Sequence, residues 1–403
     1  MSGNWSKYRL DEIAKLSMGQ SPQSKFYNTD GDGLPFFQGK TEFGEYYPSV
    51  RQFTSKTTKK AVEGDVLFTV RAPVGELNIA NQDCCIGRGL AAIQAKNENE
   101  NRFLYYILKV NTELFLSRSS GAVYDAISGG DLKSSEIFIP NNSQERIKIA
   151  KILSNYDDLI ENNLKRIKLL EESARLTYEE WFLRFRIDGK KLDIDTATGL
   201  PFEWEVRKIS DFVDTASGGT PSRRKPEEFY KDGTIPWVKT KELKNFMIID
   251  ADEHITEQGL KKSSAKMFPA NTVLLAMYGN TIGEVTFSTF PTSTNQACCA
   301  FLVKDKAYLS YFIHQYLLKN KQKILGYRMG AAQENISQQI IKSIEIEIPS
   351  ESLLQLFGKR LSEKYNLIKS LHTQNQLLKE ARDILLPRLM TGMIDTDNMD
   401  IAV

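Results

Sequence analysis

The sequence predicts an α+β protein: two copies of a mixed α/β domain, separated by two long helices that pair antiparallel as a coiled coil. Two observations support this prediction. An ordered set of motifs occurs twice in the 403 residues, and each copy is followed by a segment with the heptad rhythm of paired helices. The predicted parts are a first domain at 1–141, a central helix at 142–186, a linker and second domain at 187–349, and a final helix with a tail at 350–403.

The first observation is an internal duplication. WSKYRLDEIAKLSMGQSPQS, from Trp5, aligns without a gap with WEVRKISDFVDTASGGTPSR, from Trp204. A series of motifs repeated in one order is hard to obtain by chance, so we expect two copies of one fold. The later matches, in chain order, pair DGLPFFQGKTEF with DGTIPWVKTKEL, GDVLFTVRAPVGE with ANTVLLAMYGNTIGE, NQDCC with NQACC, and GAVYDAISGGDLKSSEIFIP with GAAQENISQQIIKSIEIEIP.

The stretch GLPFFQGKT ends like a nucleotide-binding P-loop, but it does not fit that motif. Five residues lie between its glycines where a P-loop has four, and Pro35 has no N–H to donate to a phosphate. The second copy has IPWVKTK here, without a glycine pair. The shared element is therefore a strand led by proline and a turn that carries Lys40, or Lys239 and Lys241.

Each copy has the pattern of short apolar strands joined by Gly, Pro and Asn turns, then an amphipathic helix and a last strand. The expected helices are RFLYYILKVNTELFL and YLSYFIHQYLLKNKQKIL, and the last strands are SSEIFIP and SIEIEIP. This order of elements predicts a mixed α/β domain in both halves.

The second observation is the heptad rhythm of the segments after each domain. Asn142 with Glu145 resembles a capping box, and Ser350 can cap the second helix. A helix of about 40 residues is roughly 60 Å long, so the pair would act as a stiff spacer. The seam, meaning the positions where the two helices are expected to face each other, comprises Leu153, Ile160, Asn163, Ile167, Leu170, Leu361, Ile368, Leu371, Asn375 and Leu378.

Polar residues interrupt this seam. Asn163 and Asn375 either fix the register, as buried asparagines do in coiled coils, or are tolerated at a wet part of it. Thr177 and Arg382 fit a core position poorly. The pattern therefore predicts paired helices with imperfect packing.

Composition restricts the class of protein. The chain has 53 Lys and Arg against 51 Asp and Glu, so a basic surface must come from local clustering. No signal peptide or membrane span is evident, and adjacent cysteine pairs lack metal-ligand spacing, so we expect a cytoplasmic protein without a metal site. His254, His314 and His372 have no evident catalytic partner and are expected at the surface or its boundary.

With these motifs in order, the chain resembles the specificity subunit of a type I restriction–modification system. The resemblance covers essentially the whole chain. It depends on the W…L…I…GGTP opening of each half, on YEEWFLRF, on LPFEWEVRKISDF and on the ILLPRLMTGMID ending. It implies that each domain is a target-recognition domain for one half of a split duplex DNA sequence, and that the helices set the distance between the halves.

The resemblance also implies partners and a division of labour. Two modification subunits would dock on the helices, carry S-adenosylmethionine and methylate adenine, and restriction (nuclease–translocase) subunits would join them for cleavage. This chain would bind no cofactor and no membrane, and it would not be an enzyme. Trp181 and Phe182 are expected to anchor a partner subunit, although aromatic residues at helix spacing are more often plain core.

DNA contacts are expected from polar residues in turns, because Arg, Lys, Asn, Gln, Ser and Thr read bases and Arg and Lys bind phosphates. Each candidate could also be a solvated surface residue, and the glycines and proline near Thr220 could simply shape a turn. The candidates are Ser21, Gln38, Lys40, Arg71, Arg88 and Tyr124 in the first domain, and Thr220, Arg223, Arg224, Lys239, Lys241, Tyr278, Asn280 and Arg328 in the second.

Two alternative functions stay open from the sequence. A stand-alone DNA-binding regulator with two domains would bind its site tightly as a single chain. A scaffold built on the coiled coil would not be retained on heparin or DNA resin at low salt. Neither the bases recognised nor the gap between them can be read from the sequence.

Overall fold

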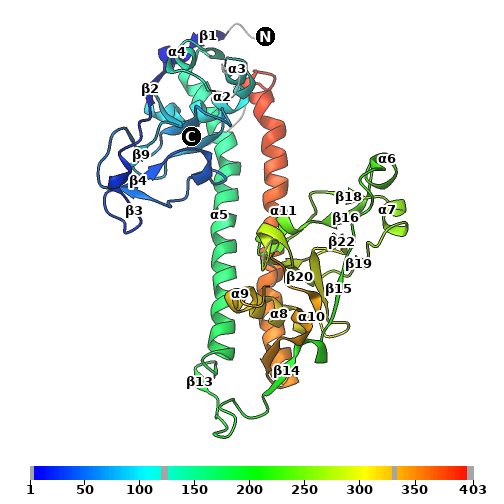
Figure 1. The fold of residues 1–403 in the computed structure, drawn as a ribbon. Coiled ribbons are helices and arrows are strands. Elements are labelled where there is room, and N and C mark those ends of the chain that lie inside the picture. The colour runs from blue at the N-terminus through cyan, green and yellow to red at the C-terminus, as the bar shows by residue number, and fades with distance from the viewer. Residues whose placement is uncertain (1–3, 119–125, 329–333, 397–403) are drawn as a thin grey trace. The chain divides into compact units, whose positions relative to one another are not determined.

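The computed structural model describes residues 4–118, 126–328 and 334–396, and it divides into two compact units. Unit 1 comprises residues 1–162 and 375–403, and unit 2 comprises residues 163–374. Each unit holds one mixed α/β domain and one stretch of each long helix (Figure 1). The predicted fold class is confirmed. The four-part division by residue number stays a prediction.

Unit 1 has three sheets among its described residues. One is an antiparallel sheet of four strands, another is a sheet of five shorter strands, and a two-stranded sheet joins the start of the domain to its end. The sheets are β1 (Trp5–Arg9) with β11 (Glu136–Pro140); β2 (Ala14–Met18), β10 (Leu90–Ala95), β7 (Val66–Thr69) and β8 (Leu77–Ile79); and β3 (Tyr27–Asn28), β5 (Phe53–Thr54), β4 (Leu34–Phe37), β9 (Cys84–Ile86) and β6 (Lys60–Ala61).

Unit 2 repeats this topology, with one strand more in its main sheet, one strand fewer in its second sheet, and an additional hairpin after the central helix. The sheets are β14 (Glu205–Lys208) with β24 (Glu345–Ile348); β15 (Asp214–Ser217), β23 (Cys298–Leu302), β20 (Thr272–Ala276), β21 (Val285–Ser288) and β17 (Met247–Ile248); β18 (His254–Ile255), β16 (Ile235–Val238), β22 (Thr292–Thr294) and β19 (Met267–Phe268); and the hairpin β12 (Arg186–Ile187) with β13 (Lys190–Lys191).

Short helices complete each domain. In both units a predominantly buried helix follows the last strand of the main sheet, as predicted from the repeated amphipathic motif. The helices are α1 (Leu10–Ile13), α2 (Asn101–Val110), α3 (Thr112–Ser117) and α4 (Gly129–Lys133) in unit 1, and α6 (Pro226–Phe229), α7 (Glu257–Lys261), α8 (Tyr308–Lys319), α9 (Lys321–Leu325) and α10 (Gln338–Ser343) in unit 2.

The long helices are α5 (Ser143–Phe182) and α11 (Glu351–Met390), which run antiparallel within each unit (Figure 1). In unit 2, Lys364 Nζ donates to Ser173 Oγ (2.8 Å) and Thr177 Oγ1 (2.9 Å). Most seam residues are buried and two are half-buried. The buried ones are Leu153, Ile160, Asn163, Ile167, Leu361, Ile368, Leu371 and Asn375, and the half-buried ones are Leu170 and Leu378.

The two poor seam residues have specific partners. In unit 1 the buried guanidinium of Arg382 pairs with the buried carboxylate of Asp157 (2.5 Å), which also accepts a hydrogen bond from Tyr106 Oη (2.5 Å). Thr177 accepts the bond from Lys364 described above. Arg382 is therefore buried and Thr177 half-buried with their polar groups satisfied by neighbouring elements.

The register corrects one part of the predicted duplication. The backbone N–H of Gly87 donates to Phe37 (2.8 Å), and the backbone N–H of Asn295 donates to Val238 (3.2 Å), so these glycine and asparagine positions are equivalent. Cys84 and Cys85 therefore lie in β9, whereas the second Cys pair lies in β23, the counterpart of β10. The match of NQDCC with NQACC does not mark equivalent residues, although each pair is buried.

Candidate nucleic-acid interface

In unit 1, the turns that follow four separate strands (β2, β4, β7 and β9) meet at one end of the sheets. The backbone N–H of Arg88 donates to Ser21 Oγ (3.3 Å). Gly89 packs so closely that a Cβ there would lie 2.2 Å from the carbonyl oxygen of Gln38. The same glycine accepts a bond from Val70 N–H (2.9 Å), next to Arg71. The structure therefore brings together four predicted DNA-binding residues, which define the turn cluster of unit 1: Ser21, Gln38, Arg71 and Arg88.

The remaining candidates of unit 1 differ. Lys40 forms an ion pair with Glu76, so its charge is partly neutralised within the domain. Arg71 and Arg88 are exposed, and no ion pair of either is recorded among the described residues. Tyr124 lies outside the described residues.

In unit 2 the equivalent turns also meet. Thr220 Oγ1 donates to Gln296 Oε1, matching the contact between Ser21 and Arg88 in unit 1. Met277 N–H donates to the carbonyl of Ala297 (2.8 Å), which places Tyr278 beside the same turn. The turn cluster of unit 2 comprises Thr220, Arg223, Lys239, Tyr278 and Gln296.

Most cations near this cluster already pair with acidic residues. Arg223 and Lys239 both bind the carboxylate of Glu253. The hydrogen bond from Arg223 lowers the pKa of Glu253 to about 2, so this acid stays ionised at neutral pH. Lys241 Nζ lies 2.6 Å from the carboxylate of Asp252, the residue that precedes Glu253. DNA phosphates would therefore compete with the protein's own carboxylates for these side chains.

The other candidates of unit 2 are more scattered. Arg224 is exposed, with its backbone N–H directed to Ser222 Oγ (3.4 Å). Asn280 is exposed in the turn that follows Tyr278. Arg328 pairs with Glu334 (2.6 Å), and no contact among the described residues joins it to the turn cluster.

Sequence reasoning missed several polar residues of these turns. Lys25 and Lys56 flank the Phe26 ring at 5.1 Å and 5.4 Å, and neither has an ion pair among the described residues. Extending the gap-free alignment by one residue would have found Lys25, because it falls opposite Arg224. Gln296 lies in the repeated NQACC motif, but nothing in the sequence indicated its partner Thr220, which lies 76 positions away.

The predicted partner anchors Trp181 and Phe182 are core residues, which corrects that expectation. Their side chains are 2% and 3% exposed, and both rings pack on Phe357, with centroid separations of 5.7 Å and 4.7 Å. A side chain buried to this extent has almost no surface left for a second protein. The spacing of these aromatic residues therefore reflects packing within unit 2.

His314 corrects a second expectation, because it is fully buried instead of lying at a boundary. Burial lowers its pKa to about 3, and its Nδ1 lies 2.6 Å from Tyr365 Oη. His254, which lies in strand β18, and His372 are partly exposed. A neutral buried imidazole is a structural group and cannot act as an acid at neutral pH.

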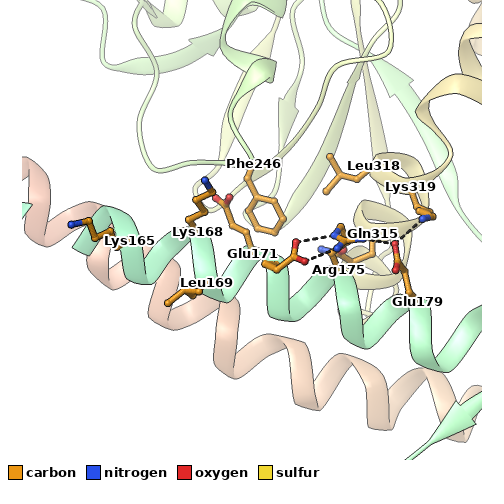
Figure 2. A pocket seen from close by; sticks show the side chains of 11 residues that line it. Lys165, Lys168, Leu169, Glu171, Arg175, Glu179, Phe246, Gln315, Leu318 and Lys319 are labelled. Atoms are coloured by element: carbon orange, nitrogen blue, oxygen red, sulfur yellow. Dashed lines mark hydrogen bonds and ion pairs between the residues drawn. The ribbon is translucent and has the colours of Figure 1, made fainter. Parts of the chain in front are cut away.

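A cavity of about 870 Å³ lies beside α5 in unit 2 (Figure 2). Phe246, Leu318 and Leu169 supply apolar walls. Burial raises the pKa of Glu171, on its rim, to about 6. The cavity faces the long helix and has no residue in common with the turn cluster, so it is not part of the candidate DNA surface.

The described residues offer little catalytic chemistry. Burial raises the pKa of Cys84 and of Cys299 to about 12, so both thiols stay protonated and unreactive at neutral pH. No group of His, Cys, Asp and Glu suited to a metal ion occurs in the described ranges. Within those ranges, no helix combines the length and the apolar character needed to cross a membrane.

Comparison with known proteins identifies the family to which this chain belongs. The type I restriction modification DNA specificity domain matches residues 2–172 and 201–380. The MjaIX specificity subunit of Methanocaldococcus jannaschii is 26% identical over 98% of this chain and 95% of its own length, and the HindI specificity subunit of Haemophilus influenzae is 24% identical over 97% and 100%. The crystal structure of the S subunit from M. genitalium superposes with a TM-score of 0.62 at 18% identity, covering 96% of each chain. The chain therefore belongs to the type I restriction modification DNA specificity family, whose function is the recognition of a DNA target.

Proposed function

We propose that this chain reads a bipartite duplex DNA target, with one half-site contacted by the turn cluster of each unit. The observation that carries the proposal is that two equivalent sets of turns present different side chains. Arg88 in unit 1 occupies the place of Gln296 in unit 2, and Gln38 occupies the place of Lys239. Base edges are distinguished by such polar groups, so two units with unlike turns would read unlike half-sites.

We propose further that α5 and α11 set the gap between the half-sites. Both helices run through both units without a break. The buried seam and the ion pair between Arg382 and Asp157 would give the helix pair the stiffness that a fixed gap requires. The turn clusters would be the recognition surface of domains 1–141 and 187–349.

Two modification subunits are proposed to dock on the long helices, and restriction subunits to join that complex. Support comes from a leucine stripe, which comprises Leu169 and Leu176 on α5 and Leu183 directly after its end, at seven-residue spacing. Their exposed fractions are 70%, 41% and 45%. Exposed leucines at heptad spacing suit a further helix. This stripe replaces Trp181 and Phe182 as the proposed contact.

The chain itself is proposed to be non-catalytic and cytoplasmic, without a bound cofactor. Methyl transfer from S-adenosylmethionine would belong to the modification subunits. The protonated thiols of Cys84 and Cys299 and the neutral imidazole of His314 are consistent with this division. Membership of a family of specificity subunits argues against a stand-alone regulator or a scaffold that does not bind DNA.

Mapping of methylated bases in the host genome tests this function. A bipartite motif with a fixed gap is expected when the chain and its modification subunits are present, and its loss is expected when the chain is deleted. Methylation spread equally over unrelated sequences would contradict the proposal. Tight specific binding by the chain alone, with no co-purifying methyltransferase, would favour the regulator.

A further inference from the structure

Three charged side chains of unit 2 form a compact triad: Arg223, Lys239 and Glu253. The guanidinium of Arg223 bonds to both oxygens of Glu253, with 3.0 Å from Nη2 to Oε2, and Lys239 Nζ donates to the same carboxylate. The side chain of Arg223 is 53% exposed, whereas that of Glu253 is 23% exposed. The carboxylate is thus fixed below the surface, and the guanidinium is presented at it.

Two aromatic rings support this guanidinium. Its carbon lies 4.0 Å from the centre of the Tyr230 ring and 5.1 Å from that of Trp237. Both rings are tied to the turn, because Tyr230 Oη donates to the carbonyl of Pro221 (2.5 Å) and Trp237 Nε1 donates to that of Gly219 (3.0 Å). Arg223 is therefore restrained before any ligand arrives, which lowers the entropy lost on binding.

Hydrogen-bond capacity indicates the ligand. Arginine has five N–H donors, and Glu253 takes two of those of Arg223, so three are left. Guanine offers the matching acceptors, because its N7 and O6 atoms lie side by side in the major groove. A phosphate fits less well, since the ionised Glu253 offsets much of the charge that would attract it.

Unit 1 has the same aromatic support without the triad. Tyr27 Oη donates to the carbonyl of Pro22 (2.9 Å), and its ring centre lies 4.8 Å from that of Phe36. These residues match Tyr230 and Trp237 in fold position. The support thus belongs to the shared fold, whereas the charges belong to unit 2 alone.

Backbone bonds identify the residues that replace the triad. Trp237 N–H donates to the carbonyl of Glu253 and Phe36 N–H to that of Gln52, each at 2.8 Å, so the glutamate and the glutamine occupy one position. The residue two places after the proline that both copies share (Pro22 and Pro221) is arginine in unit 2 and serine in unit 1. In unit 1 the positions of Arg223, Lys239 and Glu253 are held by Ser24, Gln38 and Gln52.

We propose that Arg223 reads a guanine in the half-site of unit 2, and that Glu253 is its positioning residue. The inference rests on the proposed function, and it names one specificity-determining side chain within it. Because unit 1 has neutral residues at these positions, its half-site would not use an arginine in this way.

The test maps genomic methylation in the host strain, with the full chain and its own modification subunits. In the Arg223→Lys variant, one guanine of one half-site is expected to become degenerate, with discrimination against other bases lowered about 10- to 100-fold. The other half-site stays unchanged. Glu253→Gln is expected to relax the same position more weakly, since the guanidinium is kept but loses its fixed orientation.

Arg9→Lys is the matched control. Arg9 makes a similar two-bond pair with Asp11 and is 52% exposed, but it lies outside the turn clusters. The methylation motif of the Arg9→Lys variant is expected to be the same as that of the wild type. The thermal unfolding of each variant shows whether the fold is retained.

Each outcome decides a separate claim. An unchanged motif in the Arg223→Lys variant, or methylation reduced equally at every site with the motif intact, would overturn the guanine assignment and leave the proposed function standing. Relaxation in both half-sites would also overturn it. A wild-type complex without any sequence preference would instead remove the proposed function itself.

Discussion

The buried ion pair between Arg382 and Asp157 gives a sharp stability prediction for unit 1. The two side chains are 7% and 3% exposed, so removal of either partner leaves a charge with little access to water. Loss of one partner of a buried pair costs about 3–5 kcal/mol. We expect that cost for Arg382→Met, and a smaller one for Asp157→Asn because Arg382 keeps its pair with the exposed Asp383 (2.9 Å). Each kcal/mol corresponds to a melting temperature lower by roughly 2–4 °C in a unit of this size. The amide in Asp157→Asn still accepts the bond from Tyr106.

The double variant Arg382→Met with Asp157→Asn contains no unpaired buried charge, so it is expected to cost no more than either single change. The coupling free energy, which is the sum of the two single costs minus the cost of the double variant, would then be at least about 3 kcal/mol. Urea unfolding of the full chain measures these free energies, and hydrogen exchange assigns the loss to amides of unit 1. Asp188→Asn is the control, because its pair with Arg360 (2.6 Å) is exposed and worth less than about 1 kcal/mol. Additive single effects, or an Asp157 variant as mild as the control, would refute the reasoning.

Three further changes test other parts of the account. Burial raises the pKa of Glu171 to about 6, so the folded state holds this proton to higher pH than the unfolded state, and the free energy of unfolding falls as pH rises from about 4.5 through 6. Glu171→Gln should remove this dependence on pH when unfolding curves are measured across that range. An unchanged dependence would contradict the assignment to Glu171. In Gly358→Ala a Cβ would lie 2.4 Å from Tyr308 Cβ, so we expect destabilisation by about 1–3 kcal/mol. The control Gly130→Ala, whose Cβ would lie 3.6 Å from its nearest neighbour, should be neutral or stabilising in the same assay. Equal effects of the two changes would argue against close packing at α11. Leu176→Glu should abolish co-purification of modification subunits. Because the side chain is 41% exposed, the melting temperature should stay within about 1 °C of that of the wild type. Full retention of those subunits would exclude the leucine stripe as their contact.

The architecture was predictable because it repeats. Aligning the halves gave the two domains, and the heptad rhythm gave both helices, since apolar side chains at that spacing can be buried only against a facing helix. Even the misfit of Arg382 carried information: a charge at a core position requires a buried partner. The sequence could not name Asp157 as that partner, because the partner lies 225 residues away.

The candidate site was less predictable. Residue type and turn position selected Arg223 and Lys239, but not the carboxylate of Glu253 that joins them, because the triad forms only when β16 pairs with β18. Two misreadings had the same origin: the repeated Cys pair suggested equivalence, and the spacing of Trp181 suggested a partner contact. In each case a local sequence pattern was interpreted without knowledge of the strand pairing or packing that decides which side chains are buried.

The central claim, that two units read two half-sites at a distance set by the helix pair, is tested most directly by lengthening that pair. One heptad inserted into both α5 and α11 keeps the seam in phase and adds about 10 Å, which corresponds to roughly three base pairs of duplex. The account predicts that methylation mapping will find both half-sites with unchanged bases and a gap longer by about three base pairs. Retention of the original gap by a folded and active complex, or altered bases in either half-site, would contradict it.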